Sequence, residues 1–164
     1  MSDISLTNTA AYAARYNLRL GERLGFGIHG TVRAVIYEGK QDQSAIKAHR
    51  SAPAYRRERE VYERLQELGV TDVLGFHVPQ LIRADDDLWV IEMTIVTRPF
   101  VLDFAGAYLD MKPEFSEEIW AEWEEQKRGQ FGADWSTVEA VMNAFEDFGI
   151  YLMDISPSNI AFAR

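Results

Sequence analysis

The sequence predicts an α+β fold, in which a five-stranded antiparallel sheet with one helix precedes a smaller, mainly helical half. Three observations support this prediction. Short runs of β-branched and apolar residues, separated by turn-forming residues, fill most of the first hundred positions. One strongly helical run, Tyr55–Leu65, interrupts them. Beyond a breaker at Pro99, apolar residues recur at helical spacing. We therefore divide the chain into residues 1–94 and 95–164.

The turns and helix ends of the first part carry residues suited to those features. Gly39, in the turn 38–43, is expected to take a positive φ. Pro53 suits the first turn of the helix and Gly69 its end. A short helix is also expected over residues 8–16, before the first strand. The expected strands cover residues 17–24, 31–37, 44–49, 78–83 and 88–93.

The second part is expected to be helical after a linker over residues 94–99. Apolar residues have helical spacing from Ser116 to Gln130. Ser136-Thr137-Val138-Glu139 has the capping-box pattern, in which the Ser oxygen and the Glu carboxylate satisfy exposed backbone N–H groups. This pattern predicts the start of another helix. We interpret the tryptophans of this part as core or helix-packing residues rather than as a ligand cage.

The composition argues against several classes of function. The 164 residues include no cysteine, so a disulfide framework and cysteine metal sites are excluded. The net charge is −9, with 11 Lys and Arg against 7 Asp and Glu in residues 1–66, and 6 against 19 in residues 67–164. Such an acidic chain is a poor partner for nucleic acid. His29, inside the glycine-rich segment, is interpreted as a solvated loop residue. His49 and His77 have no second ligand at metal spacing, so no role is assigned to them.

The sequence has no feature that predicts a membrane partner. No apolar run approaches the roughly 20 residues that span a bilayer. The polar residues 1–5 contain no signal-peptide core. A cytoplasmic location is therefore expected.

The segment Gly25-Phe26-Gly27-Ile28-His29-Gly30-Thr31-Val32 has the pattern G-x-G-x-x-G-x-V. A dinucleotide-binding fold needs a helix directly after such a pattern. Here residues 31–37 are rich in β-branched side chains and predict a strand. The pattern therefore indicates a hairpin turn that lays backbone N–H groups over phosphates, because glycine has no Cβ to hold the chain away.

Three further motifs follow along the chain. Lys47 lies in a short apolar strand, seventeen residues after Gly30, where a lysine is unusual unless its charge is paired. Glu58 lies in the predicted helix and is followed by apolar residues three, four and seven positions on. Asp154 and Asn159 enclose the run Ile-Ser-Pro-Ser near the end of the sequence.

Together these motifs resemble the protein-kinase-like superfamily, which has a G-x-G-x-x-G-x-V loop, an A-I-K strand, a helix glutamate and an H-R-D-x-x-x-x-N loop. The resemblance covers about residues 18–162. It implies a kinase-like N-terminal lobe, of five strands and one helix, and a reduced helical C-terminal lobe that ends in the catalytic loop.

The resemblance also implies roles for individual residues. The residues that it assigns to the nucleotide are Gly25, Gly27, Gly30, Val32, Lys47 and Glu58. Asp154 is expected to accept the proton of the substrate hydroxyl or to orient that hydroxyl, and Asn159 to hold a metal ion. Glu60 remains an alternative to Glu58 as the partner of Lys47. The two glutamates lie about 200° apart around the helix, so both cannot face the lysine.

The sequence departs from the family at the catalytic loop. Leu152 and Met153 stand where the family has His and Arg. In the family a hairpin with the metal-binding Asp-Phe-Gly comes next. Here the sequence stops at Arg164, five residues after Asn159, and no Asp-Phe-Gly motif with its metal-binding aspartate is expected anywhere in the chain. We therefore expect an ATP-binding protein with weak or no phosphotransfer activity, in which Mg²⁺ adds little.

Two alternatives to this function remain. One is a pseudokinase-type interaction module that binds no nucleotide. The other is an active kinase that a partner chain or a further segment completes, since the sequence does not establish whether Arg164 is the natural terminus.

Residues 159–162 are expected to form a strand whose family partner lies in the hairpin after the catalytic loop. An unpaired strand is a template for another chain, and exposed apolar helix faces favour association. We therefore expect a protein partner or a two-fold homodimer through the C-terminal half, which light scattering would detect. The alternative is that residues 100–135 fold back and cover the gap.

Overall fold

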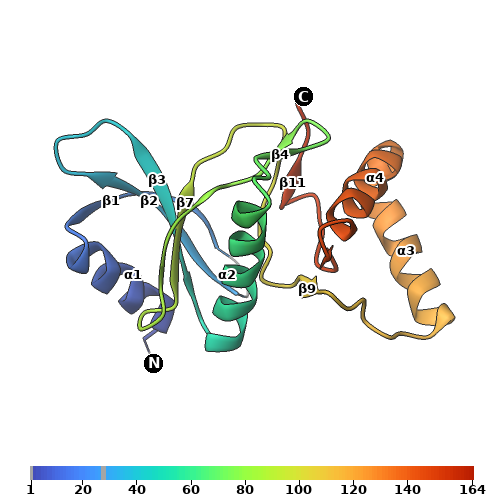
Figure 1. Ribbon diagram of the computed structural model, residues 1–164, viewed down its shortest axis with the longest axis horizontal. Helices are drawn as coiled ribbons and strands as arrows, with labels where there is room; N and C mark the ends of the chain where they lie inside the picture. The colour runs from blue at the N-terminus through green and yellow to red at the C-terminus, as the bar shows by residue number, and fades with distance from the viewer. Residues whose placement is uncertain (1, 27–28) are drawn as a thin grey trace.

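The computed structural model describes residues 2–26 and 29–164 and has an α+β fold (Figure 1). The helices are α1 (Ile4–Arg15), α2 (Ala52–Glu67), α3 (Glu117–Phe131) and α4 (Trp135–Glu146), with a short 3-10 helix at Gly132–Asp134. The main sheet contains β1 (Leu18–Phe26), β2 (Gly30–Tyr37), β3 (Gln43–His49), β6 (Leu81–Asp85) and β7 (Val90–Thr94). Two-residue strands are β4 (Asp72–Val73), β5 (Phe76–His77), β8 (Phe100–Val101), β9 (Tyr108–Leu109), β10 (Ile150–Tyr151) and β11 (Ile160–Ala161).

The main sheet confirms the predicted five antiparallel strands. Its order is β1-β2-β3-β7-β6, and every neighbouring pair is antiparallel. The predicted turns are also present, because Gly39 has φ 76° and Gly69, just beyond α2, has φ 67°. Glycine is suited to both positions, since a side chain makes positive φ costly.

Helices cover both faces of this sheet, whereas the sequence predicted one packed helix. Successive residues of a strand point to opposite faces. Ile46 and Ala48 of β3 accordingly share a buried cluster with Tyr12 of α1, and Ala45 joins the larger cluster that contains α2 residues. Figure 1 shows α1 and α2 on opposite sides of the sheet. The prediction missed this because α1 is short and rich in alanine, so its apolar face is weak in the sequence.

A buried carboxyl group secures α1 on the sheet. Glu92 of β7 is fully buried. It accepts hydrogen bonds from the Tyr12 hydroxyl at 2.8 Å and from the Ser44 hydroxyl at 3.0 Å, and also from the Tyr37 hydroxyl. Burial, together with the hydrogen bond to Glu92, raises the pKa of Tyr37 to about 12, so its hydroxyl keeps its proton. These bonds connect α1, β2, β3 and β7 at one point.

A second, smaller sheet joins distant parts of the chain. Its order is β11-β8-β5-β4, in which β8 pairs with β11 antiparallel and with β5 parallel. The expectation that residues 159–162 lack a partner within the chain is therefore wrong. Residues 100–101 fold back onto this strand, as the alternative described. Dimerisation through the C-terminal half stays a prediction.

The C-terminal half contains the helices α3 and α4 and the short pair β9–β10. Val138, Val141 and Phe145 of α4 are fully buried in the same cluster as Tyr62 of α2. The capping-box prediction is wrong, because α4 begins at Trp135 and Ser136 lies inside it. The preceding 3-10 helix leads directly into α4, so its start needs no serine cap. No helix of the described residues is long and apolar enough to cross a membrane.

Tyr12→Phe tests the role of Glu92, because it removes one donor and leaves the ring. Hydrogen bonds to charged groups contribute about 1.5–3 kcal/mol, so the variant should lower the free energy of unfolding by about that amount in urea denaturation. Tyr108→Phe is the control, since Tyr108 is 41% exposed. It should change stability by less than about 0.5 kcal/mol. Equal losses in the two variants would show that the hydrogen bond from Tyr12 to Glu92 does not stabilise the fold.

Candidate functional site

A cleft of about 690 Å³ lies between the main sheet and the C-terminal half. All the described residues that the sequence assigned to a site line it, namely Gly25, Gly30, Val32, Lys47, Glu58, Asp154 and Asn159. Gly27 lies outside the described residues. Residues that are 134 positions apart in the chain are thus brought to one cavity.

Lys47 stands at the centre of the sheet, where β3 pairs with β2 and β7. Its side chain is 7% exposed, and its Nζ lies 2.9 and 3.2 Å from the two carboxylate oxygens of Glu58. Glu60 is exposed. The structure therefore decides between the two glutamates: Glu58 is the partner of Lys47.

Glu58 is the most connected group in the site. It is fully buried, and besides Lys47 it contacts the Nε2 of His49 at 2.7 Å and accepts the backbone N–H of Phe104 at 2.5 Å. Burial alone raises the pKa of Glu58, but the charge of Lys47 and the contact with His49 outweigh it and lower the pKa to about 2. Glu58 is therefore ionised at neutral pH. His49, to which the sequence gave no role, supports this carboxylate.

Asp103 is the site residue that the sequence analysis missed. Its Oδ1 lies 2.8 Å from the Nζ of Lys47. Burial alone lowers the pKa of Lys47, but the carboxylates of Glu58 and Asp103 outweigh it and raise the pKa. Asp103 has φ 71°, in the left-handed region. Non-glycine residues rarely adopt this conformation, and those that do are concentrated at functional sites.

The pairing of β8 with β11 brings Asp103 to the loop of residues 154–159. The pairing continues one residue beyond β8, where the Leu102 N–H donates to the Asn159 carbonyl at 2.9 Å. Asp103 is the next residue in the chain, and it lines the cleft together with Asn159.

The sequence contains the tripeptide Asp147-Phe148-Gly149, so the expectation that no Asp-Phe-Gly occurs in the chain is wrong. It does not line the cleft. It forms the turn between α4 and β10, where Gly149 has φ 75° and its carbonyl accepts the Asp110 N–H at 2.8 Å. Its role is to end a helix.

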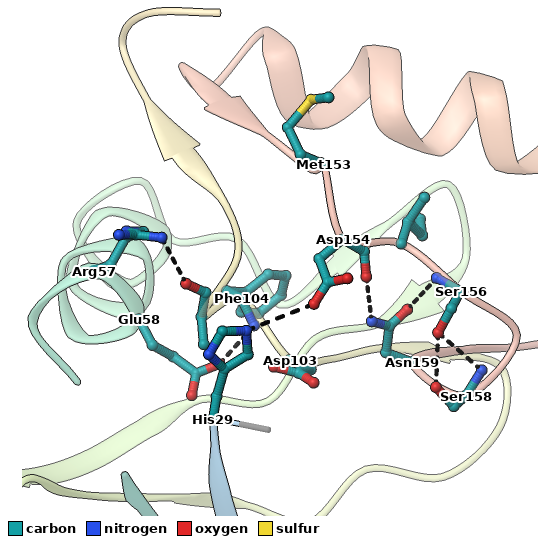
Figure 2. Close-up of polar contacts among 12 residues, drawn as sticks. His29, Arg57, Glu58, Asp103, Phe104, Met153, Asp154, Ser156, Ser158 and Asn159 are labelled. Carbon is teal, nitrogen blue, oxygen red and sulfur yellow. Dashed lines mark hydrogen bonds and ion pairs between the residues drawn. The ribbon is translucent and has the colours of Figure 1, made fainter. Parts of the chain in front are cut away.

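Asn159 shapes the loop of residues 154–159. Its Nδ2 donates to the Asp154 carbonyl at 2.7 Å and its Oδ1 accepts the Ser156 N–H at 2.8 Å. Figure 2 shows both bonds, with Asp103 close to Asp154 and Asn159. The Asp154 side chain is 54% exposed, so its carboxylate is accessible from the cleft. A Cβ added at Gly106 would lie 2.6 Å from the Cβ of Asp154, so only glycine allows this close approach.

The end of the glycine-rich segment is also held in place. A Cβ added at Gly30 would lie 2.2 Å from the carbonyl oxygen of Ala48, which excludes any larger residue there. The backbone carbonyl of His29 accepts the Arg50 N–H at 3.0 Å. The His29 ring lies close to the loop of residues 154–159, with its Nε2 3.7 Å from the Asp154 Oδ2 (Figure 2). The sequence treated His29 as a solvated loop residue, but its side chain is only 25% exposed.

The described residues include no group of three or more His, Cys, Asp or Glu side chains that could hold a metal ion by themselves. Asp103 and Asn159 together offer a carboxylate and an amide oxygen. Neither a protein-family model nor a curated protein sequence matches the chain. Any functional conclusion therefore depends on the residues and the geometry of this chain.

Glu58→Gln should change the acid stability of the protein. The pKa of Glu58 is lowered from 4.5 to about 2, so its contribution is fully present above pH 4.5 and is lost as the pH falls through about 2. This contribution is on the order of 3 kcal/mol. Glu58→Gln should therefore be less stable at neutral pH and lose less stability on acidification, as measured by urea denaturation at a series of pH values.

Glu60→Gln is the matched control, because Glu60 lies on the exposed side of the same helix. It should keep the pH profile of the wild type. A Glu58→Gln profile parallel to that of the wild type would show that Glu58 is not the buried anion of the site.

Proposed function

We propose that the chain is a kinase-like protein that binds ATP together with Mg²⁺ in this cleft. The observation that supports the proposal is the buried network of Lys47, Glu58 and Asp103, opposite Asp154 and Asn159. In protein kinases a strand lysine pairs with a helix glutamate and reaches the phosphates, and an aspartate and a loop asparagine hold the metal. Each of these residue types lies on the corresponding kind of element here.

The lining of the cleft combines two kinds of side chain. Its volume of about 690 Å³ lies within the range of small-molecule sites, which is about 300–1,000 Å³. Some lining side chains are apolar and suit a planar base, among them Leu24, Val32, Ala45, Ile95 and Leu102. The others include Lys47 and the polar residues of the catalytic loop. This combination suits a nucleotide, whose base is apolar on its faces and whose phosphates are charged.

The charged side chains that line the cleft favour a metal-bound nucleotide over a free one. One lysine stands among three carboxylates, those of Glu58, Asp103 and Asp154. Free ATP is an anion and would be repelled by Asp103 and Asp154. Mg²⁺ is commonly held by one or two protein oxygens and by substrate phosphates, so the oxygens of Asp103 and Asn159 fit it. When bound, the ion supplies charge neutralisation at the phosphates.

The order of the elements differs from that of the family, but the neighbours are the same. The family places the metal-binding aspartate in the hairpin after the catalytic loop. Here the strand after the loop, β11, pairs with β8, a strand that precedes the loop by about fifty residues, and Asp103 follows β8 after one residue. The proposal therefore depends on Asp103 lying in the same cleft as Asp154 and Asn159, and it requires a connection that differs from that of the family.

The remaining role is that of Asp154, whose accessible carboxylate is suited to orient an acceptor hydroxyl. The expectation of weak transfer depended partly on an absent aspartate, and Asp103 removes that reason. Leu152 and Met153 still replace the family's polar residues, and Leu152 is buried in the core. This observation favours the second candidate, an interaction module that transfers no phosphate.

Thermal and chemical denaturation with nucleotide test the binding. A ligand at 100 times its dissociation constant adds about 2.7 kcal/mol of stability. ATP with Mg²⁺ should stabilise the wild type by this amount, and ATP with a chelator should stabilise it less. Asp103→Asn should lose the increment that Mg²⁺ adds. The control Asp110→Asn, whose side chain is 68% exposed, should keep it. No stabilisation by millimolar ATP under either condition would favour the interaction module.

Asp154→Asn tests phosphotransfer separately from binding. The variant should lower the kcat of Mg²⁺-dependent ATP turnover by about 100-fold or more, since general acid–base groups contribute about 10²–10⁴-fold. The dissociation constant of Mg²⁺-bound ATP should stay within about twofold, because the ion offsets the phosphate charge that Asp154 would otherwise repel and the carboxylate is not assigned to the nucleotide. Asp147→Asn, in the literal Asp-Phe-Gly tripeptide, should leave turnover unchanged. Turnover that survives Asp154→Asn and is lost in Asp147→Asn would overturn the assignment.

A further inference from the structure

Three successive backbone carbonyls of the catalytic loop each accept a hydrogen bond from a side chain. The Met153 carbonyl accepts the Trp123 Nε1–H at 3.4 Å, and the Asp154 carbonyl accepts the Asn159 Nδ2 at 2.7 Å. The Ile155 carbonyl accepts the Lys127 ammonium at 2.6 Å. The first and third donors come from α3. This helix therefore holds the loop immediately before and immediately after Asp154.

Lys127 is an unusual residue for this position. It is 8% exposed, and within the described part of the chain it forms no ion pair. Its other contacts are the Gln130 side chain at 3.4 Å and the face of the Trp123 ring at 5.8 Å. Burial lowers the pKa of Lys127, and the negative charge of Asp154 opposes that effect. A buried ammonium without a carboxylate in contact is costly, so a packing role alone would be served better by an apolar side chain.

The catalytic loop of this chain needs such support. The family's polar residues before the catalytic aspartate are replaced by Leu152 and Met153, whose side chains make no hydrogen bonds to the loop. The Leu152 side chain instead packs in the main core. What holds the backbone on either side of Asp154 is Asn159 from within the loop and α3 from outside it. These bonds fix the backbone around Asp154, whose side chain is 54% exposed and lines the cleft.

We propose that Lys127 and Trp123 are positioning residues that hold the catalytic loop so that the Asp154 carboxylate points into the cleft. This inference rests on the proposed function for its catalytic consequence. Neither residue touches the nucleotide, because neither lines the cleft. Their effect is therefore on turnover and on the order of the loop, not on nucleotide affinity.

Lys127→Met keeps most of the side-chain volume and removes the donor and the charge. In the full chain without nucleotide, hydrogen exchange of the amides of residues 154–159 should become about tenfold faster or more. The kcat of Mg²⁺-dependent ATP turnover should fall about tenfold or more, whereas the dissociation constant of ADP should change less than about twofold. Lys112→Met, the same substitution at an exposed position before α3, should change none of the three.

Two milder variants keep the test valid if Lys127→Met folds poorly. Lys127→Arg retains a charged donor and should restore at least part of the kcat and of the exchange protection. Trp123→Phe keeps an aromatic side chain but replaces the indole and removes the N–H that makes the longer bond, so its effects should have the same sign and be smaller. Wild-type turnover and wild-type exchange in Lys127→Met would overturn the proposal. Faster exchange spread evenly over α3, α4 and the main sheet would also overturn it, since it indicates a packing role.

The two readouts separate this inference from the proposed function. If the wild type neither binds nor turns over ATP, the proposed function fails. The exchange measurement then still decides the structural part. If Lys127→Met loses exchange protection only at residues 154–159, α3 holds the loop as proposed. Unchanged protection overturns this part of the proposal.

Discussion

The contact on which the rest of the site depends is that of the Glu58 carboxylate with its three partners. Lys47 comes from the centre of the sheet, His49 from the end of the same strand, and the Phe104 N–H from the segment that follows β8. One fully buried anion thus fixes a helix, a strand and a loop relative to one another. Removing a partner of a buried charge is strongly destabilising, because the remaining charge is then compensated neither by that partner nor by water. The geometry of the cleft is therefore coupled to the stability of the whole N-terminal half.

The elements that the sequence predicted well are those determined by local chemistry. The strands of the main sheet follow from β-branched runs, and the turns at Gly39 and Gly69 follow from the φ that they require. The errors concern tertiary structure. The packing of α1 depends on the Tyr12 bond to Glu92, which lies 80 residues away. No local pattern contains this bond. The start of α4 differs for another reason: the 3-10 helix Gly132–Asp134 leads into it, so the helix begins one residue before the serine that was expected to cap it.

The same distinction applies to the site. Lys47 and Glu58 were predicted from local features, which are the spacing of Lys47 from Gly30 and the apolar residues three, four and seven positions after Glu58. Asp103 was missed because no local pattern marks it. Only the pairing of β8 with β11, about sixty residues apart in the chain, brings it to the cleft. Trp123 was expected to be a packing residue and Lys127 was given no role, and only the fold shows that they reach the Met153 and Ile155 carbonyls, respectively.

The electrostatics of the cleft depend on which groups face one another and not on how the chain connects them. The connection matters mechanically, because Asp103 is held near Asn159 by the β8–β11 pairing, by Lys47 and by the Phe104 bond to Glu58 and not by a short stretch of chain. Each of these is a noncovalent contact that can open locally at a cost below that of global unfolding. The position of Asp103 relative to Asn159 is therefore the part of the cleft most sensitive to loss of the Glu58 network, more than the lysine strand, which the central sheet secures on both sides.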